Sequence, residues 1–336
     1  MQETSKLKIG LCQLSVTSEK KVNNEKARSS IEYASKQGAK LVVLPVISTL
    51  DSSRFMLICS PSKLIPTIVF KELWNCPNSS DFIALFAEDF EDEESASSFK
   101  TMSQVAREQK IIVVGGSVPE RSGDRLYNTC CVFSSNGELL AKHRKIHLFD
   151  INIEGDIAFR ESDTFAAGSD PTVVDTDVGC IGIGICHDIG FPELAMLYRD
   201  RGAHLICYPG AFNISTGEAL WELEQRARQV FPCSLLSCFI FLFPCTYQSI
   251  LGTFRTVDNQ LFVATCSPSR DSAGSYPIWG HSTLVNPLGE IVATVGHDES
   301  VVVAEVDYSV VRITRESLPI LKQRREDVYQ FIGIND

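Results

Sequence analysis

The chain has 336 residues, of which 44% are hydrophobic and 22% charged, and its formal net charge is −11. This length and apolar content are typical of a globular protein with one large or two ordinary domains. A nucleic-acid binder needs clustered lysines and arginines to displace counterions from phosphates, so the acidic composition argues against a nucleic-acid partner.

The twelve cysteines are scattered along the chain and form no CxxC pairs of the kind that hold zinc. Several lie inside apolar runs, such as Cys12 and Cys207, where a free thiol behaves as a small hydrophobic group. The first residues are polar and do not resemble a secretory segment. Free thiols fit a reducing compartment, and we expect a cytoplasmic protein.

Strand and helix patterns alternate through the first half of the chain. Buried strands are predicted at 8–14, 41–45 and 111–118. Between the first two, Ala27, Ile31 and Ala34 recur at helical spacing, which predicts a helix over 23–36 that ends at Gly38. Residues 128–143 are predicted to form a hairpin that turns at Asn136-Gly137.

The second half continues the alternation. Strands are predicted at 179–186, 204–210 and 301–307, helices at 191–202, 218–228 and the C-terminus, and a second hairpin at 281–295. The glycine-rich strand at 179–186 predicts a close approach to another backbone. Mixed strands and helices with interleaved hairpins favour an α+β sandwich over a doubly wound sheet.

Two segments, 46–71 and 229–255, interrupt this pattern. The first shows no clear periodicity and contains two prolines. The second has no Asp, Glu or Lys, but Pro232 and Pro244 confine its apolar stretch to eleven positions, whereas a membrane-spanning helix needs about 20. A foreign insertion is the favoured interpretation, ahead of an ordinary core element and of a membrane span, for which 229–255 is only a weak signal.

The motif GIGICHD at 182–188 carries the first candidate for chemistry. It places Cys186 at the end of an apolar strand, just before a predicted helix. A cysteine at a strand-to-helix turn lies close to backbone N–H groups that stabilise a thiolate, which is typical of a nucleophile. On this motif alone, a buried core cysteine is the favoured interpretation.

The motif KHRKIHLFD at 142–150 carries the second candidate. Lys145 follows an apolar strand and could stabilise a developing oxyanion, but on this motif alone a solvated loop with basic residues is the favoured interpretation. His143, His147 and His187 lack acidic residues at a repeating metal-ligand spacing, so we expect no metal.

Taken together, these segments resemble the nitrilase, or carbon–nitrogen hydrolase, superfamily, and its omega-amidase branch in particular. The resemblance rests on LYNTCCVF, AKHRKIHLFDI, GICHDI, FPELAMLY, YPGAFN and TGEALWELEQRAR. It implies a four-layer α-β-β-α sandwich, pairing of subunits into a homodimer, and hydrolysis of a small-molecule amide without a cofactor.

The resemblance also implies a set of catalytic residues. The family's lysine and cysteine match Lys145 and Cys186, which is 41 positions further on, and its supporting glutamate matches Glu161. The family's first glutamate directly follows the second strand as LPE, whereas here Leu44-Pro45 is followed by Val46. The expected text resumes at Glu72, so we expect Glu72 to be the catalytic base.

Removing 46–71 restores LPELWNCP, and removing 229–255 likewise rejoins the family's running sequence, so both segments are interpreted as translated intervening sequence. The hydrolase domain is expected over 6–312, interrupted by these insertions, with a C-terminal helical extension over 313–336.

The resemblance further implies a substrate pocket lined by His187, Phe212 and Thr216. The family commonly has an arginine four residues after the nucleophile, which in omega-amidases holds the substrate's carboxylate, but here Gly190 occupies that position. By resemblance the substrate is an omega-amide of a dicarboxylic keto acid, such as 2-oxoglutaramate. The alternatives are a catalytically impaired isoform and an amidase of different substrate range.

Overall fold

The structure is a computed structural model. It describes residues 6–46, 80–92, 96–152, 158–214, 217–227, 259–270, 278–325 and 327–328. Apart from Val46, both expected insertions lie outside these residues, and so do Glu72 and Thr216.

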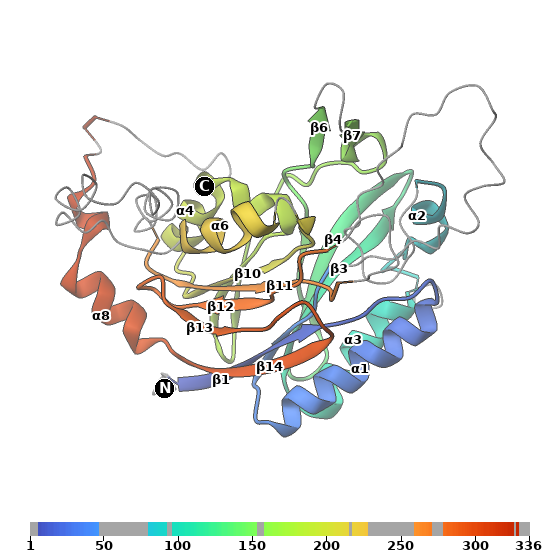
Figure 1. Cartoon of the computed structure of the whole chain (residues 1–336), viewed down its shortest axis with the longest axis horizontal. Coiled ribbons are helices and arrows are strands. Elements are labelled where there is room, and N and C mark those ends of the chain that lie inside the picture. Colours follow the sequence, from blue (N-terminus) through green and yellow to red (C-terminus); the bar gives the residue numbers. More distant parts are fainter. Residues whose placement is uncertain are drawn as a thin grey trace.

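Two six-stranded mixed sheets form the centre of the molecule (Figure 1). The first sheet contains, in spatial order, β14 (Ser300–Asp307), β1 (Lys6–Gln13), β2 (Leu41–Val43), β3 (Ile112–Ser122), β4 (Arg125–Phe133) and β5 (Leu139–Arg144). The second contains β13 (Ile291–Thr294), β12 (Thr283–Val285), β11 (Phe262–Cys266), β10 (Leu205–Pro209), β9 (Gly179–Ile183) and β8 (Thr172–Thr176). A separate hairpin joins β6 (Asp150–Asn152) to β7 (Ala158–Arg160).

Both sheets have parallel strands at their centre. In the first, β1, β2 and β3 are parallel, and in the second, β9, β10 and β11 are parallel. The remaining pairs in both sheets are antiparallel. The segments that follow the parallel strands include those that carry Cys186 and Val46, and these two residues belong to one buried cluster between the sheets.

Helices cover the outer face of each sheet. The described helices are α1 (Lys20–Lys36), α2 (Ser80–Phe86), α3 (Ser97–Gln109), α4 (Pro192–Asp200), α6 (Glu222–Ala227) and α8 (Ser309–Ser317), with short helical turns η2 (Glu161–Asp163), η3 (Cys186–Gly190), η4 (Gly217–Trp221) and η7 (Ile320–Gln323). One core lies between the sheets, a second joins α1 and α3 to the first sheet, and a third joins α4 to the second. The predicted α+β sandwich with four α-β-β-α layers is therefore confirmed (Figure 1).

The apolar run of β1 shows how sequence produces these layers. Ile9 and Leu11 face the core between the sheets, whereas Cys12 and Leu14 face α1 and α3. Because side chains alternate across a strand, a strand buried on both faces reads as a continuous apolar run. Burial of its apolar side chains contributes about 25 cal/mol per Å² of area removed from water.

Most predicted turns and element ends agree with the structure, but the end of β3 and the predicted domain boundary differ. Gly38 and Gly137 adopt φ values of +89° and +80°, as expected for a helix end and a hairpin turn. β3, in contrast, continues four residues beyond the predicted end at 118, because Glu120 and Arg121 pair with β4 despite their polarity. The predicted domain boundary at 312/313 falls inside α8.

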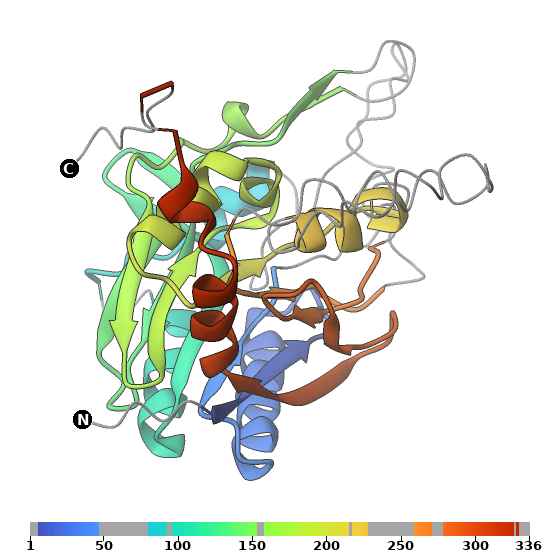
Figure 2. The ribbon, with the colours of Figure 1, turned by 90° about the vertical axis from the view of Figure 1, so that its left-hand side faces the viewer.

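The C-terminal part of the chain returns to the N-terminal part. β14 pairs with β1 along all eight residues, from Lys6 opposite Asp307 to Gln13 opposite Ser300. The helix α8 follows, faces the viewer in Figure 2, and buries Val311 in the core between the sheets. Its residue Arg315 donates a hydrogen bond to the carbonyl of Ala203, 3.1 Å away.

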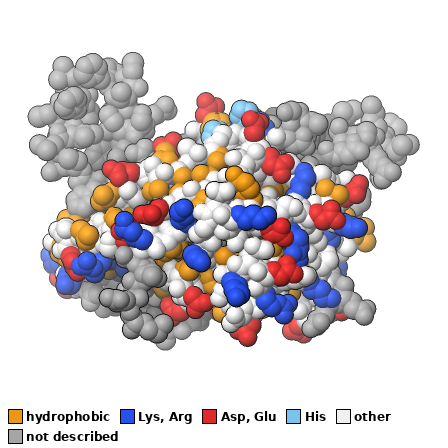
Figure 3. Space-filling view, turned by 90° about the horizontal axis from the view of Figure 1, so that it is seen from below, with side chains coloured by type: hydrophobic (Ala, Val, Ile, Leu, Met, Phe, Trp, Pro, Cys, Tyr) orange, Lys and Arg blue, Asp and Glu red, His pale blue; other side chains and the backbone are white. Residues whose placement is uncertain are grey.

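The surface shown in Figure 3 carries acidic and basic side chains side by side, without a continuous basic field on that face. A polyanion needs such a field for binding. Within the described part of the chain, no helix is both long and apolar enough to span a bilayer.

Candidate active site

Cys186 lies where β9 gives way to the helical turn η3. Its φ is +46°, in the left-handed region that non-glycine residues seldom adopt, and only 6% of its surface is exposed. Backbone strain of this kind costs about 1–3 kcal/mol and persists only where the surroundings impose it. A Cβ on Gly210 would lie 3.3 Å from the Cys186 Cα, so the glycine lets the segment after β10 pass close to this turn.

The glycines around this strand make room for aromatic rings. A Cβ on Gly182 would come within 2.7 Å of Tyr198, and one on Gly184 within 2.3 Å of Tyr208. The sequence predicted that this strand approaches another backbone closely. Gly182 and Gly184 face aromatic side chains instead, whereas Cys186, at the end of the predicted strand, does lie close to the backbone at Gly210. Tyr198 also donates a hydrogen bond to the Ile183 carbonyl, 2.5 Å away. These two tyrosines thus fix the end of the strand that carries Cys186.

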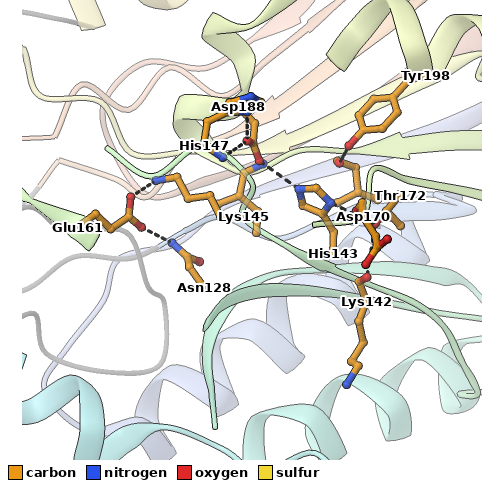
Figure 4. Close-up of polar contacts among 12 residues, drawn as sticks. Asn128, Lys142, His143, Lys145, His147, Glu161, Asp170, Thr172, Asp188 and Tyr198 are labelled. Carbon is orange, nitrogen blue, oxygen red and sulfur yellow. Dashed lines mark hydrogen bonds and ion pairs between the residues drawn. The ribbon is translucent and has the colours of Figure 1, made fainter. Parts of the chain in front are cut away.

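Lys145 and Glu161 form a buried ion pair (Figure 4). The Lys145 Nζ lies 2.7 Å from Glu161 Oε2, and the two side chains are 0% and 4% exposed. Glu161 Oε2 also accepts a hydrogen bond from the Phe149 backbone N–H at 2.7 Å. Its other oxygen, Oε1, accepts one from Asn128 Nδ2 at 3.2 Å. Glu161 is therefore placed to hold the Lys145 ammonium in one position.

Asp188 is a buried residue that the sequence did not single out. Its Oδ1 lies 2.7 Å from His147 Nδ1 and 2.9 Å from the His147 backbone nitrogen. Its Oδ2 lies 3.1 Å from His143 Nε2 and 2.9 Å from the Ile185 backbone nitrogen. Burial raises the pKa of the Asp188 carboxyl, but the bonds from His143 and His147 outweigh it, and the pKa lies well below its usual range.

The sequence contains the hydrogen-bonding partners of Asp188 but does not indicate that they contact it. His143 and His147 stood out as possible metal ligands, whereas in the structure both face the same carboxylate. Among the described residues there is no group of three or more His, Cys, Asp or Glu side chains arranged to hold a metal ion. A buried aspartate needs hydrogen-bond donors, so the histidines of the other motif could have been considered as donors to Asp188.

His187 directly follows the cysteine and packs against aromatic rings. Its ring contacts those of Phe149 and Phe191 edge to face, with centroids 5.0 and 5.2 Å apart. Burial lowers the pKa of His187, and the nearby charge of Lys145 lowers it further. Both effects favour the neutral form of the imidazole.

Two further pocket positions differ in how far the structure describes them. Phe212 lies after β10 and contacts the Trp221 ring edge to face at 5.0 Å. It also packs against the cluster that contains Cys186. Thr216 lies outside the described residues, so its expected place in the pocket stays a prediction.

Gly190, where the family resemblance implies an arginine, faces an acidic side chain. A Cβ added at Gly190 would lie 4.0 Å from Glu224 Oε1 and 4.0 Å from His187 Nδ1. Glu224 belongs to α6, which packs against the turn η3. The position thus presents a carboxylate and an imidazole rather than a guanidinium.

Val46 occupies the position where the resemblance implies the first glutamate. It is fully buried and belongs to the same cluster as Cys186. Glu72, the expected base, lies outside the described residues, and its approach to Cys186 stays a prediction.

Comparison with known families decides the class of the protein. The model of the carbon–nitrogen hydrolase family matches residues 8–231 and 246–316. The chain belongs to the carbon–nitrogen hydrolase family. The gap between the two matched ranges, 232–245, lies inside the expected insertion 229–255, whereas 46–71 lies within the first matched range.

This carbon–nitrogen hydrolase is similar to named omega-amidases over nearly its whole length. It is 50% identical to the chloroplastic omega-amidase of Arabidopsis thaliana, covering 98% of this chain and 75% of that protein. It is 39% identical to omega-amidase NIT2 of Bos taurus, covering 96% of each.

Among solved structures, Nit3 of Saccharomyces cerevisiae, a member of branch 10 of the nitrilase superfamily, is 35% identical and superposes with a TM-score of 0.73 over 95% of this chain and 97% of that one. The C. elegans NitFhit protein is 25% identical and superposes with a TM-score of 0.75 over 97% of this chain and 66% of that one. The expectation of an amide-hydrolysing enzyme from the nitrilase superfamily is thereby confirmed.

Proposed function

We propose that this hydrolase cleaves the terminal amide of a dicarboxylic keto-acid monoamide such as 2-oxoglutaramate, and releases ammonia through a cysteinyl acyl-enzyme. The relatives named omega-amidases support the reaction class. The observation that carries the proposal is the joining of the two motifs. The segment around Lys145 and the turn that holds Cys186 come from different sheets, and hydrogen bonds to Asp188 hold them together.

In the proposed reaction, Glu72 takes the proton of the Cys186 thiol, and the thiolate attacks the amide carbon. The Lys145 ammonium and the His187 backbone N–H stabilise the oxyanion of the tetrahedral intermediate. The C–N bond then breaks, the nitrogen leaves as ammonia with the proton from Glu72, and a thioester remains. Glu72 activates a water molecule, which attacks the thioester and releases the acid and the thiol.

Glu161 supports this mechanism as the partner of Lys145. Burying an ammonium without a counter-charge is costly, and the short contact to Glu161 supplies a counter-charge beside Lys145. An oxyanion that forms beside a preorganised charge in low dielectric is stabilised far more than in water.

The position of Val46 supports Glu72 as the base of the shortened chain. If 46–71 were absent, Glu72 would follow Pro45 directly and take the place of Val46, which packs in the cluster around Cys186. In the full chain the same 26 residues separate Glu72 from that place. A base displaced by about 1 Å can cost 10²-fold in rate, so a catalytically impaired isoform is the first alternative.

An amidase of different substrate range is the second alternative, and Gly190 favours it. A carboxylate-bearing substrate would meet Glu224 where the resemblance implies an arginine. Without a guanidinium at this position, a substrate carboxylate loses a charge-assisted contact, which favours a neutral amide or carbamoyl compound.

A single assay separates these possibilities. Purified protein is supplied with 2-oxoglutaramate and with a neutral amide of similar length, and ammonia release is measured against Cys186→Ala as the blank. Mass spectrometry of a rapidly quenched sample detects the acyl group on Cys186. Ammonia from 2-oxoglutaramate supports the omega-amidase, ammonia from the neutral amide alone supports the second alternative, and no release with either substrate supports the impaired isoform.

We also propose that the enzyme is a cytoplasmic homodimer. The resemblance to the nitrilase superfamily supports the dimer. The scattered cysteines are typical of a protein in a reducing compartment, which supports the cytoplasmic location. Light scattering after size-exclusion chromatography measures the subunit number, and a fluorescent fusion in its native cell reports the compartment. A monomeric mass, or fluorescence confined to an organelle, would contradict the respective statement.

A further inference from the structure

Asp188 connects the two segments that carry the proposed catalytic residues. His143 and His147 stand two positions before and two positions after Lys145, and both rings bond to the Asp188 carboxylate. Asp188 itself stands two positions after Cys186. In Figure 4 the carboxylate lies between the two histidines, while Lys145 points away from it toward Glu161. One buried carboxylate therefore spans the gap between the segment after β5 and the segment after β9.

The same carboxylate closes the turn around Cys186. The Ile185 backbone N–H donates to Asp188 Oδ2, and the Asp188 backbone N–H donates to the Ile185 carbonyl 3.0 Å away. These reciprocal bonds enclose Cys186, whose left-handed backbone needs such external support. Without the carboxylate, the Ile185 N–H would lose its acceptor in the interior, which favours a rearranged turn.

The hydrogen-bond roles around Asp188 are set by chemistry. An ionised carboxylate only accepts hydrogen bonds, so His147 Nδ1 and His143 Nε2 must each carry a proton. The other nitrogen of His143, Nδ1, lies 3.1 Å from the Thr172 hydroxyl. Thr172 begins β8, the neighbour of β9, so the network also reaches the edge of the second sheet.

We propose that Asp188 is a positioning residue that sets the distance and orientation of Lys145 relative to Cys186. This inference rests on the proposed thiol mechanism. Asp188 acts through its neighbours: it fixes the backbone at His147 and the ring of His143 on either side of Lys145, and it holds the turn that presents the Cys186 sulfur.

The geometry makes Asp188→Asn a sharp test, although the two side chains have the same shape. Each carboxylate oxygen accepts from one backbone N–H, His147 on Oδ1 and Ile185 on Oδ2. An asparagine has a single acceptor oxygen, so in either orientation its NH₂ group faces a backbone donor. A histidine could change its tautomer to adapt, but a backbone amide cannot.

The experiment compares kcat, KM and the rate of Cys186 alkylation by iodoacetamide in the wild type and in Asp188→Asn. All rates are measured on the folded fraction isolated by size-exclusion chromatography and normalised to its concentration, which removes the contribution of unfolded protein. We expect kcat to fall roughly 10²-fold with little change in KM, because misplacement by about 1 Å costs that much. We also expect slower alkylation.

Glu88→Gln is the matched control. Glu88 is another fully buried carboxylate, bonded to the Ser98 and Phe99 backbone N–H groups and to Lys20, at the start of α3. Its loss should lower stability without changing normalised kcat or alkylation. If Asp188→Asn behaves like Glu88→Gln, Asp188 is merely structural and the proposal is overturned.

A second pair of variants is useful if Asp188→Asn fails to fold. His147 donates through its ring at 2.7 Å while its side chain remains 27% exposed, so substitutions there are milder. His147→Ala should lower kcat about tenfold, since bonds to charged groups are worth roughly ten- to hundredfold. His147→Asn should restore most of it, because the asparagine Nδ2 can replace the Nδ1 donor. Both variants lose the stacking on Phe191, so equal kcat in the two would overturn the proposal.

The two readouts separate this proposal from the proposed function. If the wild type hydrolyses no amide, the proposed function fails, and alkylation alone then decides on Asp188. Slower alkylation in Asp188→Asn and in His147→Ala, with recovery in His147→Asn, supports positioning. Unchanged alkylation in all three overturns it.

Discussion

Deletion of residues 46–71 should raise kcat of the enzyme roughly 10²-fold. The deletion joins Pro45 to Glu72 and thereby puts a carboxylate where Val46 now lies, fully buried in the cluster that contains Cys186. A positioned general base contributes about 10²- to 10⁴-fold, and a displacement of about 1 Å removes roughly 10²-fold of that advantage. The lower end of this range, about 10²-fold, is expected if Glu72 of the full chain reaches the thiol but lies about 1 Å from its best position.

The assay is ammonia release from 2-oxoglutaramate at saturating substrate, normalised to alkylatable Cys186. Deletion of 229–255 alone is the matched control, because it removes a segment of similar length and leaves Glu72 in place. A third protein combines the 46–71 deletion with Glu72→Gln, which keeps the shortened loop and removes the base. Equal kcat for the full chain and the 46–71 deletion, or a deletion that does not fold while the full chain does, would refute the reasoning.

Three further outcomes are expected. At neutral pH, iodoacetamide should modify Cys186 first among the described cysteines, because burial raises the pKa of each of the other six; peptide mapping that finds another described site first would contradict the assignment. Gly190→Arg should raise kcat/KM for a carboxylate-bearing amide about ten- to a hundredfold more than for a neutral amide. Adding Glu224→Gln should increase this difference, because it removes a competing partner for the arginine. Equal gains on both substrates would exclude a role of position 190 in carboxylate recognition. Glu161→Gln should lower the free energy of unfolding by about 3–5 kcal/mol, because it removes the Glu161 charge from beside the buried Lys145 ammonium. Adding Lys145→Met should recover part of that loss in urea denaturation, and a double variant no more stable than Glu161→Gln alone would argue against the ion pair.

The layers of the fold could be predicted because apolar periodicity encodes them directly. The run around Ile9 and Leu11 is apolar on both faces of β1, and in the structure both faces are buried. The extension of β3 through Glu120 could not be predicted in this way. Glu120 is polar, yet it is buried because Lys142, Arg144 and Thr129 all bond to its carboxylate from neighbouring strands.

The candidate site was predictable only in part for a related reason. Cys186 and Lys145 could be proposed because the family resemblance fixes their spacing. Asp188 could not, because its importance comes from donors more than 40 positions away along the chain, and local sequence does not say which buried donors a carboxylate will meet. The proximity of Glu224 to Gly190 could not be predicted either, since Glu224 belongs to a separate helix.

The pairing of β1 with β14 has a consequence for how the protein is made. Strand β1 leaves the ribosome long before its partner β14, because Lys6 pairs with Asp307. At roughly 5–20 residues per second, the intervening chain takes about 15–60 s to synthesise. During that time the β14 side of β1 has no strand to complete it, and an open strand edge is a template for association with other chains. Chaperone dependence of the nascent chain should therefore end only once residues beyond 307 have emerged.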